Sequence, residues 1–459
     1  MSDDSIPDLT ISPDRLERQF SDSKPLYTES EAIIEANRCL NCYDAPCISA
    51  CPTGIDIPSF IKKIASGNIR GSAKVIFEAN MLGYSTGRVC PVEELCVGAC
   101  VYNDLNHSPI QIGRLQRYAT EKALEEEVRT GKKLFPPNSK KSEKRVALIG
   151  GGPASLACAA YLALDGVKAV IFEKDDLPGG LNTTAVAPYK FQTEDSIGEA
   201  NWILRHGIEL RRGIEVGKDI QFDELIEAYD AVFIGIGLGR DGHLALPGSD
   251  GPDVWGATDL IRQIKNNPEF LLPEDLHTVL VIGGGNTAID ISRELAMLGV
   301  EDVRILYRRS RKEMRGYNHE MAGASHYGVR LVENVMPARV IREGDKVKGL
   351  QVNSTVSDES FEVPCDWVVE AIGQQKHVSD VTPNIEVDEM GRLVVDSKTR
   401  RTGHPKVYAG GDCINGGKEV VNAAEDGREA ASNMLKTWGI EPSLHGEKYF
   451  KSLVKHSGP

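Results

Sequence analysis

The feature that most constrains this chain is a glycine-rich strand–turn–helix unit that occurs twice. The first copy, "RVALIGGGPASLACAAYLALDGVKAVIFEK", places Gly150, Gly152 and Ser155 in the pattern G-x-G-x-x-(small). The first glycine makes the turn, the second lets a pyrophosphate approach the backbone, and the small third residue lets the helix pack on the strand. The second copy, "TVLVIGGGNTAIDISRELAMLGVEDVRILYRR", has the same offsets at Gly283, Gly285 and Ala288. Two such units predict an α/β chain with two doubly wound nucleotide-binding domains.

The second strand of each copy ends differently, and this end selects the nucleotide. Glu173 ends the strand of the first copy, where a carboxylate can bind ribose hydroxyls. In the second copy Arg308 and Arg309 take that place, and Arg315 follows closely. An arginine fork suits a 2′-phosphate, which a carboxylate would repel. The first site is therefore expected to bind FAD and the second NADPH, with NADH possible, although a solvated basic patch is the alternative reading of the arginines.

Glycine motifs outside the two copies point to the same ligands. Gly179 and Gly180 in "LPGGLN" allow a flat ligand close to the backbone, or else form a plain turn. In "KVYAGGDCINGGKEVVNAAEDGREAA" a strand runs through Gly410 and Gly411 to Asp412 and then to a helix whose N-terminus could stabilise a reduced flavin ring. An earlier strand ends in "EAIG", with Ala371 and Gly373 expected on the nicotinamide side. The return to flavin features after the second copy predicts that the NAD(P) domain is inserted into the FAD domain.

Seven of the ten cysteines fall within the first hundred residues, in "CLNCYDAPCISACP" and "GRVCPVEELCVGAC". They are Cys39, Cys42, Cys47, Cys51, Cys90, Cys96 and Cys100. Structural zinc usually takes four ligands from Cys-x2-Cys pairs, whereas short spacings that end in Cys-Pro are typical of iron–sulfur ligands. Iron–sulfur clusters are therefore favoured over zinc or free thiols. The remaining three, Cys158, Cys365 and Cys413, are expected to be small core residues.

Two cubane clusters need eight ligands, so seven cysteines leave one position to another side chain. The stretch after Cys100 offers His107, Gln111 and Gln116. Any one of them could equally be a surface polar residue near the start of a helix, so the residues alone leave this choice open.

Composition and charge limit the classes of function. The 459 residues carry a net charge of −14, which argues against nucleic-acid binding. The apolar runs are too short to span a membrane, and residues 1–30 lack the apolar core of a signal peptide. A cytoplasmic chain is expected, where cysteines serve metal or redox chemistry rather than disulfides.

From about Cys39 to Ala431 the chain resembles the electron-input subunits of bacterial dihydropyrimidine dehydrogenases, which are related to the small subunit of glutamate synthase. The matching stretches include "CLNCYDAPCISACPTGIDIPSFI", "PIQIGRLQRYA", "GGGPASLACA", "FIGIGLG" and "YAGGD". In the pyrimidine enzymes a glutamine in a Leu-Gln pair is the eighth cluster ligand, and a glutamate is expected there in the glutamate synthase relatives. Leu115-Gln116 matches the former pattern.

The resemblance implies a role for individual residues. One [4Fe–4S] cluster would be held by Cys39, Cys42, Cys47 and Cys100, and the other by Cys51, Cys90, Cys96 and Gln116. Implied flavin-binding residues are Gly150, Gly152, Ser155, Glu173, Gly180, Leu181, Lys190, Gly411, Asp412 and Val420. Lys190 departs from the arginine expected at its place, so a single charge replaces a planar fork. Implied nicotinamide-nucleotide residues are Gly283, Gly285, Asn286, Thr287, Arg308, Arg309, Arg315, Ala371 and Gly373. No catalytic acid or base is expected, because the cofactors carry the hydride chemistry.

The expected domains are a helical domain over 1–135 with both clusters, an FAD domain over 144–267 and 376–440, an NAD(P) domain over 268–375 and a tail over 441–459. No FMN-binding barrel is expected after Ala431. The chain is therefore expected to pass electrons from NAD(P)H through FAD and the clusters to an FMN-containing catalytic subunit that reduces uracil or thymine. A hetero-oligomer is therefore expected. The alternatives are a glutamate synthase small subunit, the large subunit of an NADPH–ferredoxin oxidoreductase, and a non-catalytic FAD and iron–sulfur assembly scaffold.

Overall fold

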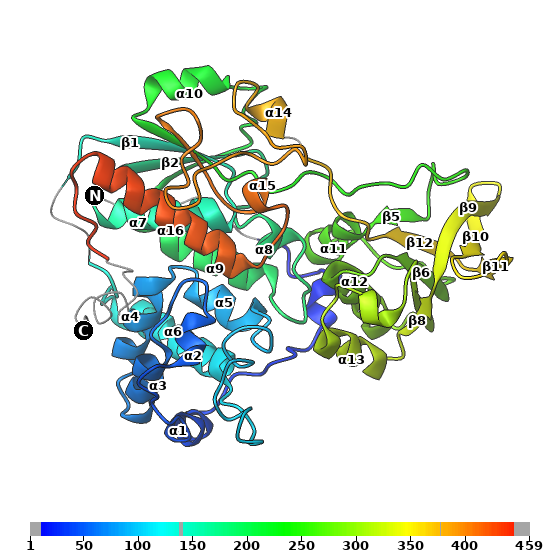
Figure 1. Cartoon of the computed structure of the whole chain (residues 1–459), viewed down its shortest axis with the longest axis horizontal. Helices are drawn as coiled ribbons and strands as arrows, with labels where there is room; N and C mark the ends of the chain where they lie inside the picture. Colours follow the sequence, from blue (N-terminus) through cyan, green and yellow to red (C-terminus); the bar gives the residue numbers. More distant parts are fainter. Residues whose placement is uncertain (1–10, 137–140, 377, 445–459) are drawn as a thin grey trace, which may run out of the picture.

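The computed structural model describes residues 11–136, 141–376 and 378–444. The middle of the linker after the helical domain and most of the expected C-terminal tail lie outside this range. Helices of the N-terminal part form one body, and two α/β parts lie beside it (Figure 1). Among the described residues, no helix combines the length and the apolar character that a membrane span requires. The expected fold class, with its helical iron–sulfur domain and its inserted nucleotide-binding domain, is confirmed.

Short polar signals set the ends of the N-terminal helices. The Thr28 hydroxyl and Glu31 form a reciprocal capping box at the start of α1, and Asp56 accepts a hydrogen bond from Ser59 N at the start of α3. Gly131, in the left-handed conformation, ends α6. The elements are η1 (Leu16–Gln19), α1 (Glu29–Asn37), α2 (Pro46–Ser49), α3 (Ile57–Ala65), α4 (Ile69–Ala79), α5 (Gly83–Val89) and α6 (Ile112–Thr130).

The first sheet has five parallel strands in the order β13-β4-β1-β2-β3. β1 and β2 are near-continuous apolar runs, as expected for strands that helices cover on both faces. The strands are β1 (Arg145–Ile149), β2 (Lys168–Glu173), β3 (Glu209–Arg212), β4 (Ala231–Ile234) and β13 (Val407–Ala409). The helices are α7 (Pro153–Leu164), α8 (Leu181–Thr184), α9 (Thr193–Leu204), α10 (Phe222–Ala228), α14 (Val378–Val381), α15 (Asp412–Asn415) and α16 (Val420–Thr437).

The second sheet repeats this arrangement in the order β5-β12-β6-β7-β8, again parallel. Its strands are β5 (Val254–Gly256), β6 (Thr278–Ile282), β7 (Asp302–Tyr307), β8 (Arg330–Glu333) and β12 (Trp367–Glu370). The helices are α11 (Ala257–Asn266), α12 (Asn286–Met297), η2 (Arg311–Glu313) and α13 (Asn318–His326). An antiparallel sheet of β9 (Val335–Glu343), β10 (Lys346–Ser354) and β11 (Ser360–Pro364) extends from its side (Figure 1).

One boundary differs from the expected position. β5 pairs with β12 through Val254 and Val368, so the second sheet takes up residues before 268, where the sequence placed the start of the NAD(P) domain. β5 is only a three-residue edge strand after a loop rich in glycine, proline and aspartate, and such a strand has little periodic signal of its own.

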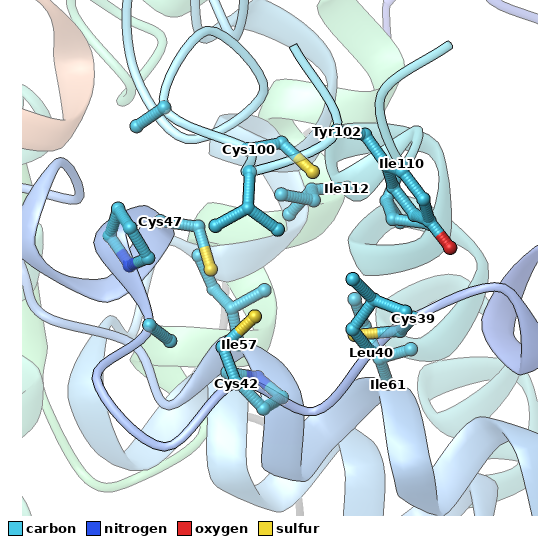
Figure 2. A pocket seen from close by; sticks show the side chains of 15 residues that line it. Cys39, Leu40, Cys42, Cys47, Ile57, Ile61, Cys100, Tyr102, Ile110 and Ile112 are labelled. Atoms are coloured by element: carbon cyan, nitrogen blue, oxygen red, sulfur yellow. The ribbon is translucent and has the colours of Figure 1, made fainter. Parts of the chain in front are cut away.

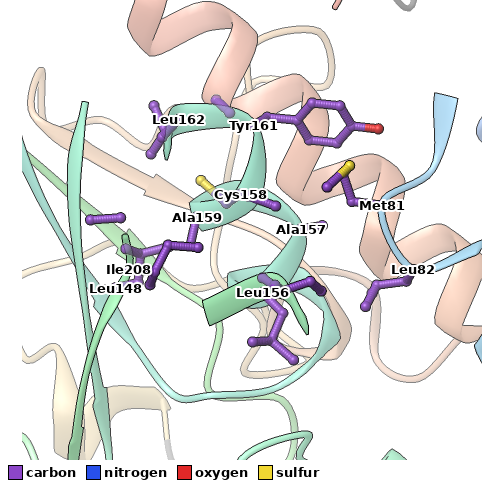
Figure 3. Close-up of a cluster of buried hydrophobic side chains, with 14 of the residues drawn as sticks. Met81, Leu82, Leu148, Leu156, Ala157, Cys158, Ala159, Tyr161, Leu162 and Ile208 are labelled. Atoms are coloured by element: carbon purple, nitrogen blue, oxygen red, sulfur yellow. The ribbon is translucent and has the colours of Figure 1, made fainter. Parts of the chain in front are cut away.

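The helical domain and the first α/β part share one hydrophobic core. Met81 and Leu82, just before α5, pack with Ala157 and Tyr161 of α7 (Figure 3). Cys158 is fully buried in the same core, and Cys365 and Cys413 are buried elsewhere, as expected for small core residues. Because apolar packing without voids resists sliding, this shared core fixes the cysteine-rich domain against the first sheet.

Candidate functional site: two thiol clusters beside two nucleotide-binding turns

Four cysteines from both ends of the helical domain surround one cavity. Cys39, Cys42 and Cys47 come from the loop after α1 and from α2, and Cys100 comes from the loop before α6. Figure 2 shows the sulfur atoms of Cys42, Cys47 and Cys100 directed into the cavity. Burial, and then the neighbouring Cys39, Cys100 and Cys42 thiols, raise the pKa of Cys47 to about 12. The four thiols that the resemblance assigns to one cluster are therefore together.

The remaining three cysteines of the domain form a second group. Burial raises the pKa of the Cys90 thiol well above its ordinary value, and the nearby Cys96 and Cys51 thiols raise it further. Burial also raises the pKa of the Cys96 thiol, and the nearby Cys51 and Cys47 thiols raise it further. Cys47 thus lies near both groups, so the two sites are neighbours.

Gln116 lies against α5, the helix that ends just before Cys90. Its Nε2 atom donates to Gly83 O at 2.8 Å and to Thr86 Oγ1 at 3.0 Å. A Cβ atom on Gly87 would lie 3.4 Å from the Gln116 Cγ atom, so α5 and α6 are in direct contact here. Among the described residues, none donates a hydrogen bond to the amide oxygen of Gln116. The two bonds fix the amide and leave its oxygen available as a ligand.

The donor set fits iron–sulfur clusters. Thiols in a largely apolar wall, with Ile57, Ile61 and Ile112 around the first cavity, match the cysteine ligation and low polarity that cubane clusters take. In the described residues no three Cys, His, Asp or Glu side chains form a group that could hold a single metal ion. Four thiols spread around a cavity suit a larger group, because a cubane contacts its ligands at separate corners.

The first glycine-rich turn forms a cradle for a pyrophosphate. Gly150 has φ of +88°, and a Cβ atom there would lie 2.7 Å from Gly235 O. Glu173 Oε2 accepts a hydrogen bond from Gly151 N at 2.5 Å, while Ser155 lies buried under the turn. Burial raises the pKa of Glu173, although the N–H groups of Asp175 and Gly151 oppose this shift. These residues fit the FAD-binding role expected of them.

The residues expected at the flavin end lie at the start of two helices. Gly411, at φ of +79°, precedes α15, and its N–H donates to Asp426 Oδ2. Asp412 Oδ1 accepts from Lys418 N at 3.1 Å, and burial raises the pKa of Asp412. Val420 is the first residue of α16, so the helix N-terminus and its partial positive charge lie at this position.

On the other side of the pyrophosphate turn, Gly180 and Leu181 begin α8. A Cβ atom on Gly180 would lie 3.0 Å from the Gly152 Cα atom, which leaves room only for glycine at this close approach.

Lys190 occupies a different setting from a simple flavin contact. Its Nζ atom lies 2.7 Å from Asp290 Oδ1 and 2.8 Å from Glu320 Oε1, both in the second α/β part. Burial lowers the pKa of Lys190, but the two carboxylates outweigh this and raise it to about 12. Lys190 therefore ties the FAD domain to α12 and α13.

The second glycine-rich turn also has the shape of a nucleotide cradle. Gly283 has φ of +151°, and a Cβ atom there would lie 2.4 Å from Ala371 O. Gly285 precedes α12, whose first residues are Asn286 and Thr287, so their N–H groups point toward any bound phosphate. Gly373, at φ of +107° and exposed, follows β12 at the same edge. The structure brings together all the residues assigned to this turn.

The three arginines lie at the outer end of this turn. Arg308, Arg309 and Arg315 are exposed, and none forms an ion pair within the described residues. Arg315 lines a surface pocket with Arg311, Lys312 and Tyr317. Free guanidinium groups next to a nucleotide turn are available for a phosphate, whereas paired ones would not be.

A set of residues that no sequence motif predicts connects these sites. Tyr317 OH donates to Glu419 Oε1 at 2.8 Å, and His319 lies close to Glu93 and Glu94 in the loop between Cys90 and Cys96. None of these five residues stands in a recognisable motif. Only the tertiary contact between distant segments reveals them.

Comparison with known proteins assigns both halves of the chain. Residues 16–128 match the family described as dihydropyrimidine dehydrogenase domain II, 4Fe-4S cluster, and residues 144–427 match the pyridine nucleotide-disulphide oxidoreductases. Thioredoxin reductase of T. acidophilum has a similar fold, with a TM-score of 0.54 and 22% identity over 64% of this chain and 99% of that chain.

Relatives that match this chain over most of their own length include proteins of two differently named groups. The chain is 32% identical to the glutamate synthase [NADPH] small chain of Escherichia coli K12, over 89% of this chain and 92% of the relative. It is 34% identical to the NAD-dependent dihydropyrimidine dehydrogenase subunit PreT of Escherichia coli O157:H7, over 89% of this chain and 94% of that protein. The two identities are too similar to separate the groups.

Proposed function

The chain belongs to the pyridine nucleotide-disulphide oxidoreductases that carry an added 4Fe-4S domain, and from this premise we propose that this NAD(P)H-dependent flavin iron–sulfur enzyme is the electron-input subunit of a dihydropyrimidine dehydrogenase. FAD, when bound, accepts a hydride and releases single electrons, which [4Fe–4S] clusters can carry onward. The two glycine-rich turns hold the two nucleotides, and the chain's own side chains position them.

Gln116 is the observation that carries this choice. A glutamine ligand is implied by the resemblance to the pyrimidine enzymes, and a glutamate by the resemblance to glutamate synthase. The Gln116 amide nitrogen donates to the Gly83 backbone oxygen and to the Thr86 hydroxyl, both in α5, so the amide oxygen is the atom available to a ligand. A carboxylate at this position could not donate those two bonds to Gly83 O and Thr86 Oγ1. The two acceptor atoms of α5 therefore favour an amide over a carboxylate at position 116.

The electrostatic surroundings of Cys90 also favour an order of electron transfer. The Glu419 carboxylate, just before α16 at the flavin end, is among the groups that raise the pKa of Cys90, after burial and the Cys96 and Cys51 thiols. The group of Cys51, Cys90 and Cys96 would thus be nearer the flavin, and we call it the proximal cluster site. The group of Cys39, Cys42, Cys47 and Cys100 would then be the distal cluster site.

The distal cluster site lies where a partner could reach it. Leu40 and Tyr43, beside Cys39 and Cys42, expose 53% and 78% of their surface. Exposed apolar side chains around a redox site favour docking of a protein partner. The proposed partner is an FMN-containing chain that reduces uracil or thymine.

An anaerobic assay with NADPH and with NADH tests the proposal. The purified chain should reduce an artificial dye but form no dihydrouracil from uracil. Addition of the FMN-containing catalytic chain of a dihydropyrimidine dehydrogenase should produce dihydrouracil. Dihydrouracil formed by this chain alone would refute the division of labour, and absence of dye reduction would favour an assembly scaffold.

The glutamate synthase small chain remains the second candidate, because its similarity extends over nearly the same part of the chain. The assay distinguishes it directly. If the large glutamate synthase chain supports glutamate formation from glutamine and 2-oxoglutarate while the FMN-containing chain leaves uracil unchanged, the second candidate is correct.

A further inference from the structure

Residues 316–320 form a short segment that touches all three parts of the molecule, and we call it the bridging segment. It follows Arg315 directly and includes Gly316, Tyr317, His319 and Glu320. Gly316 N donates to Gly284 O at 2.9 Å in the second glycine-rich turn. The bridging segment is thus attached to the turn on which the nicotinamide nucleotide would sit.

A second bond ties the segment to the helix that follows this turn. Tyr317 N donates to the side-chain Oδ1 atom of Asn286, the first residue of α12, at 2.9 Å. A pyrophosphate bound at the N-terminus of α12 would compete for the N–H groups there or reorient the Asn286 side chain. Tyr317 is therefore placed to respond to nucleotide binding through its backbone.

The same residue reaches the flavin end through its side chain. Tyr317 OH donates to Glu419 Oε1 at 2.8 Å, directly before α16. Burial raises the pKa of Glu419, and the hydrogen bond from Tyr317 lowers it in part. The Tyr317 hydroxyl therefore holds a carboxylate that lies near Cys90.

The far end of the bridging segment contacts the cluster domain and the FAD domain. The His319 ring stacks on Tyr317, with centroids 5.6 Å apart and planes inclined by 11°. Its nitrogen atoms lie 3.6 Å from Glu93 Oε2 and 3.8 Å from Glu94 Oε1. Glu320 pairs with Lys190 of the FAD domain at 2.8 Å. Glu93 and Glu94 belong to the loop that connects Cys90 to Cys96.

We propose that the bridging segment couples the nicotinamide-nucleotide site to the proximal cluster site, so that nucleotide binding changes the reduction potential of the proximal cluster. Tyr317 and His319 act as positioning residues: they hold Glu419, Glu93 and Glu94 relative to Cys90 and Cys96. Carboxylates and hydrogen bonds around an iron–sulfur cluster set its potential, so a shift of these three groups changes it. This coupling rests on the cluster assignment in the proposed function.

Such coupling is reciprocal. If the nucleotide changes the reduction potential of the cluster, it must bind the oxidised and the reduced protein with different affinities. A fivefold difference in affinity, at the low end of typical allosteric coupling, corresponds to about 40 mV for a one-electron couple, since tenfold corresponds to about 59 mV. A shift of this size is measurable by potentiometry.

The test is an anaerobic redox titration of the whole protein, with the EPR signal of each cluster recorded with and without 1,4,5,6-tetrahydro-NADP, a redox-inert nucleotide. In the wild type the nucleotide should shift the potential of one cluster by about 40 mV or more and leave the other within about 10 mV. Tyr317→Phe removes only the bond to Glu419, and His319→Gln removes the imidazole. Each should reduce the shift by at least half.

Tyr327→Phe is the matched control, because Tyr327 follows the same helix, α13, but does not contact Glu419, Glu93 or Glu94 in the described structure. It should retain the full shift. Two intact EPR signals without a nucleotide-dependent shift, or equal shifts in all variants, would overturn the coupling alone. Absence of a second cluster signal in the wild type would overturn the cluster assignment and the coupling with it. If Tyr317→Phe does not fold, His319→Gln and the ratio of nucleotide affinities in the oxidised and reduced wild type decide the question.

Discussion

The amide of Gln116 gives the sharpest test at the scale of a single residue. Gln116→Ala removes the one non-cysteine ligand assigned to the proximal cluster, so the iron content should fall from about eight to about four per chain. Gln116→Glu should keep a cluster but change its potential, because an anionic ligand replaces a neutral one. Iron analysis and EPR spectroscopy of the purified variants provide the measurement.

Gln111→Ala is the control for this substitution. Gln111 lies at the start of the same helix, and among the described residues its side chain bonds only to the backbone oxygen of Pro109. Full iron content is expected there. If Gln116→Ala also keeps about eight irons and both signals, Gln116 is not a ligand.

The second prediction concerns the exposed arginines at the second glycine-rich turn and their part in NADPH binding. Arg308→Ala combined with Arg315→Ala should raise the KM for NADPH by roughly ten- to a hundredfold, because each charge-assisted bond to the 2′-phosphate contributes about 1.5–3 kcal/mol. The KM for NADH should change little, since NADH lacks that phosphate. Steady-state dye reduction with each nucleotide measures the effect.

The control removes the same charge elsewhere. Arg129 and Arg205 are exposed on other helices and make no ion pair within the described residues. Arg129→Ala with Arg205→Ala should leave both KM values unchanged. Equal weakening toward NADH and NADPH in the Arg308 and Arg315 variant would mean that these arginines bind a group common to both nucleotides.

Local motifs made some site residues predictable and left others hidden. The position of Glu173 follows from a strand, a turn and a helix of fixed length, so sequence spacing was enough to find it. The partners of Lys190 were not predictable, because Asp290 and Glu320 belong to a domain inserted about a hundred residues later. Glu419 was also missed. A half-buried carboxylate that accepts a hydrogen bond from Tyr317 has no sequence signature in either segment.

Helix packing is the dominant constraint at the scale of secondary structure, and Gly427 gives its clearest case. A Cβ atom on Gly427 of α16 would lie 2.2 Å from Ala154 O and 2.8 Å from Cys158 N in α7. Gly427→Ala should therefore force the helices apart and destabilise the protein by about 1–3 kcal/mol. Because α7 begins at the first glycine-rich turn, FAD affinity should fall as well. Thermal unfolding and flavin release measure both effects.

Gly198 provides the opposite case. It lies exposed inside α9, and no atom would lie within 4 Å of an added Cβ atom. Gly198→Ala should therefore stabilise the protein by about 0.5–1 kcal/mol through better helix propensity. A lower unfolding temperature for Gly198→Ala, or no change for Gly427→Ala, would contradict this account of the two glycines.

The contact between α5 and α9 depends on a buried carboxylate. Glu199 Oε1 accepts hydrogen bonds from Tyr84 N at 3.1 Å and Ser85 N at 3.0 Å. Burial raises the pKa of Glu199 to about 7, although its bonds to Ser85 lower it in part. The folded protein therefore binds this proton more tightly than the unfolded chain, whose ordinary value is 4.5. Its stabilisation is fully present below about pH 4.5 and is lost as the pH rises through about 7.

Glu199→Gln should remove this part of the pH dependence, because a neutral amide can still accept both bonds. The wild type should lose up to about 3 kcal/mol of stability between pH 5 and pH 8 relative to the variant. Unfolding temperatures at several pH values measure the difference. Glu224→Gln, on the exposed side of α10, is the control and should follow the wild type. Parallel curves for Glu199→Gln and the wild type would contradict the assignment.

Regular elements were predictable in proportion to their periodic signal. β1, α7 and β2 lie where the first glycine-rich copy placed them, because their apolar pattern and turn residues agree. β5 was missed because three residues at a sheet edge are stabilised by their partner strand and not by their own pattern. The antiparallel sheet of β9, β10 and β11 was likewise not anticipated, since nothing in the glycine motifs requires it.

For the whole molecule, the shared core makes the cluster domain and the FAD domain a single body. Met81 and Leu82 of the helical domain pack with residues of α7 (Figure 3). Phe77 belongs to the same core, as do Ala200 and Trp202 of α9. The distance from the flavin end to Cys90 should thus stay constant during turnover. The junction between the FAD domain and the inserted domain combines apolar packing of Ala187 and Tyr189 with polar contacts of Lys190 and Tyr317.

A fixed proximal and distal order predicts how the loss of each cluster affects the rest of the chain. In Gln116→Ala, which lacks the proximal cluster, NADPH should bleach the flavin at the wild-type rate, because both nucleotide turns are intact. The EPR signal of the distal cluster should then appear at least tenfold more slowly, since electrons would have to cross the gap that the proximal cluster normally fills. Stopped-flow absorbance and freeze-quench EPR spectroscopy measure the two rates.

Cys42→Ser is the complementary variant, because Cys42 lines only the distal cavity. Its flavin and its proximal cluster should both be reduced at the wild-type rate, whereas electron delivery to an FMN-containing partner should be lost. The two variants together determine the direction of flow through the helical domain. The order is reversed if Cys42→Ser slows reduction of the proximal cluster while Gln116→Ala leaves the reduction rate of the distal cluster unchanged. The partner would then have to dock at the loop between Cys90 and Cys96 instead of beside Leu40 and Tyr43.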